Sequence, residues 1–258
     1  MPHLVDPTLT RRERQRESTY VDIVAASREL LAESPELSLR AVAAKMGMTA
    51  PALYRYVANY QELVDLVAFE IDKAATLTFA EAADALDPDD APGRLVAATT
   101  EFRQWALGNP HEFAIVFANP VAEAACVRRD LLTLASSGLL MTDLIHDVWR
   151  QRGFAIPAID DLPDVVRASL EDPLIPAKVE DLAREDRGLV WVYMQGWTQL
   201  YGVVVLEVMG HMDPRVIESG EMFIDVIRRF APTIGLAEEM PRLETLIRER
   251  LGRTPGQP

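Results

Sequence analysis

Cysteine is almost absent from this chain of 258 residues, because Cys126 is the only one. An intramolecular disulfide is therefore excluded, and the composition fits a reducing compartment such as the cytoplasm. The opening stretch MPHLVDPTLTRRERQR has no apolar core after its charges, so we expect no secretory signal. At this length the chain can bury a sizeable core and form one or two domains.

Strand signals are also scarce. No hairpin dipeptide separates two β-like runs, and apolar and polar residues do not alternate over any sustained stretch. Helical periodicity dominates instead, so the sequence predicts an all-α fold.

Motifs for catalysis and for cofactors are missing as well. No glycine-rich phosphate loop occurs, and the four histidines are too scattered for a zinc site. Ser136, His146 and Asp147 have the residue types of a hydrolase set, but adjacent helical residues point in different directions and no nucleophile elbow surrounds the serine. We therefore expect no enzyme, no cofactor and no metal.

Charged residues are absent from Gly188 to Leu206, and an uncharged run of this length is a candidate for a membrane span. Three polar side chains interrupt the run, Glu207 ends it, and no second span exists. A helix that is apolar on most sides also suits a core or a subunit interface. We expect that role, and no contact with a membrane.

Positive charge is scarce overall, with a net charge of −14, but it is unevenly distributed. Residues 1–60 hold eight basic and seven acidic side chains (+1), which leaves 18 basic and 33 acidic side chains (−15) for the rest of the chain. Phosphate binding depends on the local potential, so the acidic total does not exclude nucleic acid. Four of the six residues 11–16 are arginine, so the segment 1–17 is either a basic arm that contacts DNA or a solvated tail.

Helix signals follow one another along the first 83 residues. Ser18 is the predicted cap of a first helix whose apolar positions begin at Tyr20. A second helix is predicted after Ser38, with Gly47 as its stop. Thr49 is the predicted cap of a very short third helix that ends at Tyr56, and Asn59, with Glu62 as its reciprocal partner, caps a fourth that ends near Ala83.

The rest of the chain also predicts helices. A loop is expected at 85–93 and a long connection with short helical turns at 153–185. Between and beyond them, we expect helices at 94–108, 110–118, 121–152, 187–210, 214–231 and 241–251.

Two short helices joined by a tight turn form a helix-turn-helix, whose second helix can enter the major groove of DNA. Here Val42, Met46 and Leu53 are expected to fix the crossing of the two helices. The polar and aromatic side chains left for outward contacts are those of Arg40, Lys45, Thr49, Tyr54, Arg55 and Tyr56.

The segment Leu37–Val64 resembles the DNA-binding region of the TetR family of regulators. The resemblance rests on Ala43-Ala44-Lys45-Met46-Gly47 and on Leu53-Tyr54-Arg55-Tyr56-Val57-Ala58-Asn59-Tyr60-Gln61-Glu62-Leu63. It implies that Ala50–Tyr56 is a recognition helix. Two departures from the family pattern are Tyr56 in place of histidine and Tyr60 in place of lysine, which removes one charge that could release a counterion.

The resemblance implies a role for each matching position. Arg40 would reach a guanine edge or a phosphate, and Ala50, Pro51 and Ala52 would face bases, where they meet thymine methyl groups. Tyr54 and Tyr56 would donate to phosphates, and Arg55 would contact either. Alternatively, Tyr54 or Tyr56 only packs against its neighbours. The implied DNA-binding set is Arg40, Thr49, Ala50, Pro51, Ala52, Tyr54, Arg55, Tyr56 and Tyr60.

The C-terminal part resembles family members that carry the pattern W-x-x-x-H-G-x-x-x-L-E, here Trp197 to Glu207 with Tyr201 in place of the histidine. The resemblance implies a homodimer through the helices 187–210 and 214–231. Periodicity agrees, because apolar faces line both segments, and a monomer core is the alternative. The residues on these faces are Leu189, Val192, Gly196, Leu200 and Val203; Trp197, Tyr201, Val204 and Val208; and Phe223, Val226, Ile227 and Phe230.

A small-molecule effector completes what the resemblance implies. Effector sites are mostly apolar with a few polar groups, and the middle helices supply aromatic and soft side chains that either line such a site or are plain core. These candidates are Trp105, Phe113, Phe117, Met141, His146, Trp149, Met194 and Trp197.

The whole chain is thus expected to be a regulator of transcription that binds double-stranded operator DNA and is released by an apolar or aromatic effector. The expected parts are an arm (1–17), a three-helix domain with the helix-turn-helix (18–64), a helical ligand-binding and dimerisation domain (65–235) and a tail (236–258). A carrier of apolar ligands, or an enzyme on the same scaffold, is the alternative, and it would lack DNA affinity and its salt dependence.

Overall fold

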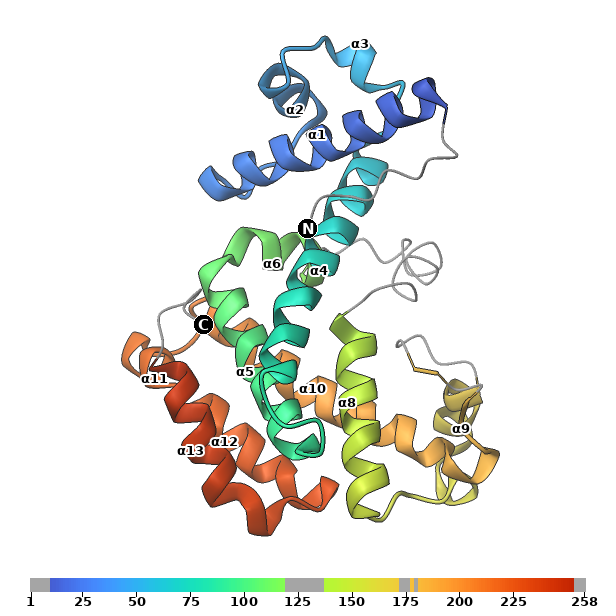
Figure 1. The fold of residues 1–258 in the computed structure, drawn as a ribbon, viewed down its shortest axis with the longest axis vertical. Helices are drawn as coiled ribbons and strands as arrows, with labels where there is room; N and C mark the ends of the chain where they lie inside the picture. The colour runs from blue at the N-terminus through green and yellow to red at the C-terminus, as the bar shows by residue number, and fades with distance from the viewer. Residues whose placement is uncertain (1–9, 119–136, 172–176, 179–180, 253–258) are drawn as a thin grey trace. The chain divides into compact units, whose positions relative to one another are not determined.

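The protein, represented by a computed structural model, is all-α. The structure describes residues 10–118, 137–171, 177–178 and 181–252, and these contain helices and turns but no strand (Figure 1). Cys126, residues 1–9 of the expected arm and the first part of the helix predicted at 121–152 lie outside the described residues. The chain forms two compact units, residues 1–71 with 111–119, and residues 72–110 with 120–258.

The first unit is built from α1 (Arg11–Glu33), α2 (Leu39–Lys45), α3 (Ala50–Leu53), the first half of α4 (Tyr60–Asp84) and α6 (Pro110–Phe117) without its proline. Its core consists of aliphatic side chains that are fully buried, because each helix turns its apolar stripe inward. These side chains are Ile23, Leu31, Val42, Leu53, Leu63, Val64 and Val67.

The cap of the first helix lies eight residues before the cap predicted at Ser18. Thr10 is the true cap: its hydroxyl accepts the backbone N–H of Glu13 at 3.3 Å, and the Glu13 carboxylate accepts the backbone N–H of Thr10 at 2.7 Å. This reciprocal pair satisfies two N–H groups that the helix start leaves without partners. The prediction at Ser18 was therefore wrong, and residues 11–17 are the first turns of α1.

Helix α6 packs against α1 within the first unit. The Arg28 guanidinium donates to both carboxylate oxygens of Glu112, at 2.6 and 3.1 Å, and His111 Nδ1 lies 2.7 Å from the carbonyl oxygen of Leu31. Phe113 is fully buried here, with its ring 5.2 Å from that of Phe117. This pair therefore belongs to the first unit.

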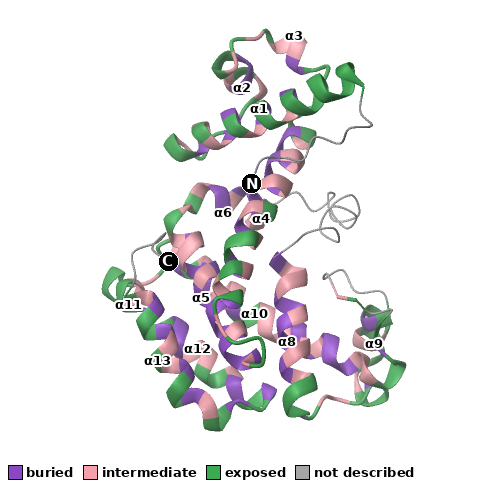
Figure 2. Cartoon of the chain, viewed as in Figure 1, coloured by how far each residue is buried: buried purple, intermediate pink, exposed green. Residues whose placement is uncertain are grey.

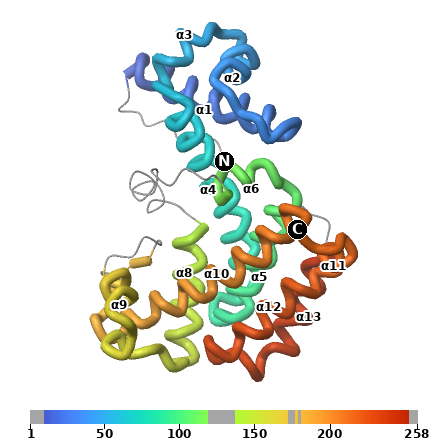
Figure 3. The backbone as a smooth tube through the Cα atoms, turned by 180° about the vertical axis from the view of Figure 1, so that it is seen from behind, coloured from blue at the N-terminus to red at the C-terminus, as the bar shows by residue number. Residues whose placement is uncertain are grey.

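The second unit contains the remaining helices. They are the second half of α4, α5 (Ala91–Gly108), α8 (Ser137–Arg152), α9 (Asp164–Glu171), α10 (Gly188–Val208), α11 (Pro214–Ser219), α12 (Glu221–Phe230) and α13 (Met240–Leu251), with short 3₁₀ turns at 159–161, 184–187, 231–234 and 237–239. Seen from behind, α10 crosses this unit from α9 to α11 (Figure 3).

Two boundaries in the second unit differ from the prediction. Helix α5 begins at Ala91, inside the expected loop 85–93, because Asp90 caps it by accepting the Gly93 N–H at 3.0 Å and Pro92 suits the first turn. The helix predicted at 214–231 is broken at Gly220, whose φ of 68° is the left-handed conformation that glycine adopts without strain. The single predicted helix is therefore two helices, α11 before the break and α12 after it.

The segment 236–258, expected as a tail, contains α13, which was predicted as a helix near 241–251. This helix packs against α5 and α12, with Leu243 and Ile247 fully buried. The Arg250 side chain donates to the carbonyl oxygen of Ala82 at 2.9 Å, and the Arg250 carbonyl accepts from Gln104 at 2.9 Å. Helix α13 is therefore part of the core of the second unit.

A buried ion pair joins three helices of the same unit. The Arg103 guanidinium on α5 donates to both carboxylate oxygens of Glu207 on α10, at 2.6 and 3.1 Å, and to the Ile217 carbonyl of α11 at 2.5 Å. Both charged side chains are at most 4% exposed, so each charge depends on the other for its solvation. Burial raises the pKa of Glu207 although Arg103 opposes that shift.

Candidate functional site

The helix-turn-helix forms where the sequence predicted it. The Ser38 hydroxyl accepts the Ala41 N–H at 3.2 Å and so caps α2. Gly47 ends the helix with a φ of 66°, and the Met48 N–H closes the turn on the Ala43 carbonyl at 2.9 Å. Thr49 precedes α3 as predicted, but its side chain makes no capping hydrogen bond.

Helix α3 is seated on α2 by apolar contacts. Val42, Ala43, Leu53 and Val57 are at most 2% exposed. The helix ends at Leu53, not at Tyr56 as predicted, and residues 54–56 continue as a turn in which the Tyr56 N–H bonds to the Leu53 carbonyl at 2.8 Å. The recognition segment Ala50–Tyr56 is therefore one short turn of helix followed by a tight turn.

The candidate DNA-binding residues differ in exposure. Tyr54 is 51% exposed and Tyr60 is 48% exposed, whereas Ala50, Ala52 and Tyr56 are half-buried. The other members are exposed, namely Arg40, Thr49, Pro51 and Arg55. All nine lie in the first unit, on α2, at Thr49 before α3, in the recognition segment and at the first residue of α4.

Tyr56 has a packing partner that sequence reasoning missed. The ring of Tyr20 on α1 lies edge-on to the Tyr56 ring, with 5.8 Å between centroids, and the Tyr20 hydroxyl donates to the Tyr56 carbonyl at 3.2 Å. Arg16, one turn earlier, donates to the Tyr20 hydroxyl at 3.0 Å. The sequence offered a signal only for the contact between Arg16 and Tyr20, because residues four apart lie on the same face of a helix.

Helix α4 starts with two side-chain caps. Asn59 accepts the Glu62 N–H at 2.9 Å, as predicted, but the Glu62 carboxylate accepts the N–H of Ala58 at 2.5 Å, not that of Asn59. Lys45, expected among the outward contacts, pairs with Glu29 of α1 at 2.8 Å, and this hydrogen bond raises its pKa. The positive charge offered by α2 itself is therefore mainly that of Arg40.

Two of the candidate effector residues meet in an aromatic cluster of the second unit. The Trp105 ring on α5 lies 5.8 Å from Phe79 of α4, Phe79 lies 5.7 Å from Phe102, and Phe102 lies 5.8 Å from Trp197 of α10. Trp197 in turn stacks on Tyr201 at 5.6 Å with 23° between the planes. The buried Phe79 and Phe102 join the two tryptophans, and only their helical spacing among apolar residues could have indicated them.

The other candidates do not share that cluster. His146 and Trp149 of α8 have ring centroids 5.8 Å apart and are half-buried. Met141 is buried on the same helix and Met194 is half-buried on α10. Phe113 and Phe117 belong to the first unit, so the eight candidates do not form one set within one unit.

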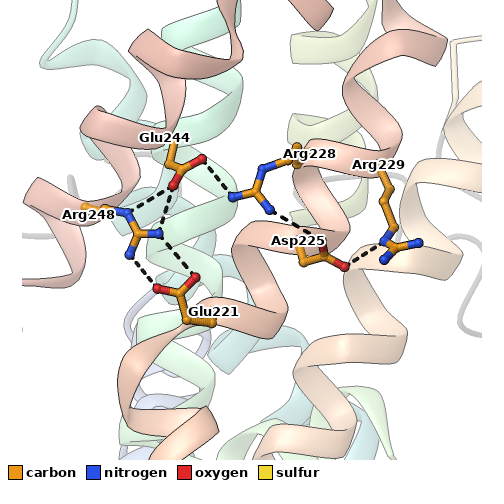
Figure 4. Close-up of polar contacts among 6 residues, drawn as sticks. All are labelled: Glu221, Asp225, Arg228, Arg229, Glu244 and Arg248. Carbon is orange, nitrogen blue, oxygen red and sulfur yellow. Dashed lines mark hydrogen bonds and ion pairs between the residues drawn. The ribbon is translucent and has the colours of Figure 1, made fainter.

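A groove of about 650 Å³ lies elsewhere in the second unit and contains none of the eight candidates. Its lining includes Arg228, Glu244 and Arg248, which belong to a charge network between α12 and α13 (Figure 4). Arg248 bonds to Glu221 and Glu244 at 2.7 and 2.8 Å, and Arg228 bonds to Glu244 at 2.8 Å. These carboxylates already occupy the two guanidinium groups, so the network fastens α13 to α12.

The apolar faces predicted for dimer contact are partly buried within the chain. Leu189, Val192, Leu200 and Val203 are at most 8% exposed, and Val204 and Phe223 are fully buried. Gly196 faces Phe230, whose ring would lie 3.0 Å from an added Cβ, so glycine permits the close approach of α10 and α12. The other side chains of these faces are only half-buried, namely Trp197, Tyr201, Val208, Val226, Ile227 and Phe230, so a dimer contact through these helices stays a prediction.

Other apolar side chains on the same helices are exposed. Leu206 and Met209 at the end of α10 are 41% and 43% exposed, and Met222 of α12 is 40% exposed. An added Cβ at Gly202 would meet nothing within 4 Å. Within the described residues, none of the helices is both long enough and apolar enough to cross a bilayer.

An all-α chain with an N-terminal helix-turn-helix has the architecture of the helix-turn-helix class of DNA-binding proteins. The family model described as "Tetracyclin repressor-like, C-terminal domain" matches residues 95–230, which is more than half of the chain. The chain therefore belongs to the tetracyclin repressor-like family, as the resemblance implied.

Curated proteins and a solved structure agree with this assignment. The chain is 32% identical over 113 residues to the HTH-type transcriptional regulators Rv1816 of Mycobacterium tuberculosis and Mb1846 of Mycobacterium bovis. The match covers 43% of this chain and 48% of each relative, so the chain spans about half the length of the curated relatives it matches. The crystal structure of RolR in complex with resorcinol has the same fold, with a TM-score of 0.58 at 13% identity, covering 95% of this chain and 99% of that one.

Proposed function

We propose that the chain is a sequence-specific DNA-binding regulator of transcription. The observation that carries this proposal is the recognition segment, which Leu53 seats against α2 while Tyr54 and Arg55 stay exposed. A short helix displayed in this way fits the major groove, whose base edges distinguish all four base pairs. The curated relatives named as HTH-type transcriptional regulators support the same function.

The contacts divide into two kinds. Arg40 and Arg55 would bind guanine edges or phosphates, and the small side chains of Ala50, Pro51 and Ala52 would contact thymine methyl groups. The hydroxyls of Thr49, Tyr54 and Tyr60 would donate to phosphates. Tyr56 would contribute mainly by packing, because its ring and its carbonyl are already engaged by Tyr20.

A homodimer would place two recognition segments about 34–36 Å apart, one turn of DNA. Exposed apolar side chains on α10 and α12 favour this assembly, because a partner's copies of these helices would remove their apolar surface from water. The contact would add Gly202, Leu206, Met209 and Met222 to the half-buried part of the faces predicted from the sequence.

A small aromatic molecule would act as the effector. RolR, which shares the fold, was crystallised with resorcinol. The half-buried Trp105 and Trp197, at the two ends of the aromatic cluster, would supply ring faces and edges for such a ligand. Helix α4 is continuous from the first unit into the second. Helix α4 would adopt one conformation in the DNA-binding state and another in the released state. The effector would lower the DNA affinity only to the extent that it binds the released state more tightly.

The test is direct binding of the purified protein to the DNA beside its own gene, measured by fluorescence anisotropy against a scrambled duplex. Preferential binding to a palindrome, with an affinity that falls steeply with salt, is the expected result. Resorcinol is the first effector probe, and release of the bound DNA is expected. A protein that binds aromatic ligands but shows neither DNA affinity nor a salt dependence would instead be a carrier.

A further inference from the structure

The first two turns of α1 form an exposed basic segment. Residues 11–16 contain four arginines and one acidic residue, Glu13. The Glu13 carboxylate is engaged by the backbone N–H of Thr10, and hydrogen bonds from Thr10 lower its pKa, so this charge is held at the helix start. All four arginines are exposed, as the green first turns of α1 in Figure 2 show.

Two of these arginines lie on the face of α1 that is buried further along the helix. Residues 12, 16, 19 and 23 follow the spacing of four, three and four that places side chains on one side of a helix. Thr19 and Ile23 on this face are buried. Because α1 begins before its core contacts do, the same face carries Arg12 and Arg16 into solvent at the end of the helix.

This end of α1 is fixed relative to the recognition segment. The Arg16 guanidinium donates to the Tyr20 hydroxyl through Nη2 at 3.0 Å and Nε at 3.3 Å, and that hydroxyl donates to the Tyr56 carbonyl at 3.2 Å. Tyr56 is the last residue of the recognition segment. The chain of contacts therefore runs from the basic turns of α1 to the end of the segment that would enter the groove.

We propose that Arg12 and Arg16 form a second DNA contact surface, which binds backbone phosphates outside the base pairs read by Ala50–Tyr56. This inference rests on the proposed DNA-binding function. Arginine suits the task, because its guanidinium is always charged and presents five donors, of which Tyr20 occupies those on one edge of Arg16. Continuity with the recognition segment through Tyr20 and Tyr56 favours DNA over an acidic protein as the partner.

Phosphate contacts strengthen binding without reading sequence, so their loss has a distinct signature. Each contact adds about 0.9 to the slope of log affinity against log salt. In a dimer the variant Arg12→Gln removes two contacts, so the slope is expected to fall by about 1.8 and the affinity at 0.1 M salt by roughly 60-fold. The loss should be equal for the operator and for a scrambled duplex.

Arg14→Gln is the matched control, because residue 14 lies on the opposite side of the helix from residues 12 and 16 and carries the same charge. We expect it to change the slope by less than half as much as Arg12→Gln. Circular dichroism of each variant checks that α1 still forms. The double variant Arg12→Gln/Arg16→Gln extends the same measurement to both residues.

Three outcomes would overturn the proposal. One is a double variant that binds the operator with the same salt dependence of affinity as the wild type. This result would not affect the proposed regulator function. The second is an equal effect of Arg14→Gln, which would show that the arginines attract DNA only through their total charge, without defined phosphate contacts. The third is a changed base preference at the flanking positions, which would assign these residues to the bases. Absence of any DNA binding by the wild-type protein would remove the proposed function itself.

Discussion

Replacing Asp72 by asparagine is expected to stabilise the second unit near neutral pH. Asp72 on α4 is 5% exposed, and its two carboxylate oxygens accept the N–H of Ser137 at 3.4 and 3.3 Å. Burial disfavours the charged form and raises the pKa of Asp72 from 3.8 to about 6, more strongly than the hydrogen bonds from Ser137 lower it. Asparagine keeps the shape and an acceptor for Ser137 but carries no charge.

The size and sign of the effect follow from the two pKa values. The folded protein holds the proton more tightly than the unfolded chain, so the stabilisation is fully present below pH 3.8 and is lost as the pH rises through about 6. The difference corresponds to about 3 kcal/mol of unfolding free energy. Asp72→Asn should therefore be more stable than the wild type at pH 8, by up to about 3 kcal/mol, and nearly equal to it at pH 4.

Urea unfolding followed by circular dichroism at several pH values between 4 and 8 measures this difference. Asp161→Asn, at an exposed aspartate of the same unit, is the matched control and should show no such trend. A stability difference between Asp72→Asn and the wild type that stays constant across this range would show that the charge of Asp72 does not destabilise the fold, as would a variant that is less stable at pH 8.

Two further substitutions test which buried side chains stabilise each unit. Leu53→Ala removes the fully buried side chain that seats α3, so it should cost the first unit about 2–5 kcal/mol and abolish DNA binding, while thermal unfolding of the second unit stays unchanged. Glu207→Gln leaves the buried Arg103 without a charged partner and should cost about 3–5 kcal/mol in urea unfolding. The paired change Arg103→Met/Glu207→Leu should recover most of that loss, and a double variant as unstable as Glu207→Gln would contradict this account.

The elements that depend on local signals could be predicted from the sequence. Ser38 and Gly47 bound α2 as expected, because a capping hydroxyl and a left-handed glycine act on their own neighbours. The start of α1 was missed although Thr10 and Glu13 have the spacing of a capping box, since the apolar stripe begins only at Tyr20. Periodicity finds the part of a helix that contacts a core, and the first turns of α1 extend beyond it.

Contacts between distant segments could not be predicted. Arg103 and Glu207 lie 104 residues apart, and nothing in either neighbourhood identifies the other as its partner. Periodicity also showed that Leu189 and Leu200 lie on an apolar face of α10, but not whether the same chain or a second copy covers it. The same ambiguity separates core aromatics such as Phe79 and Phe102 from an effector site.

Contact of DNA with the segment Ala50–Tyr56 and with Arg40 can be measured by comparing one double variant with the wild type. The variant Arg40→Ala/Tyr54→Phe changes two exposed side chains outside the core, so the fold should persist. In an anisotropy titration against the operator, we expect its affinity to fall at least tenfold below that of the wild type, consistent with about 1–3 kcal/mol for a good base contact alone. Binding indistinguishable from the wild type would contradict the assignment of this surface.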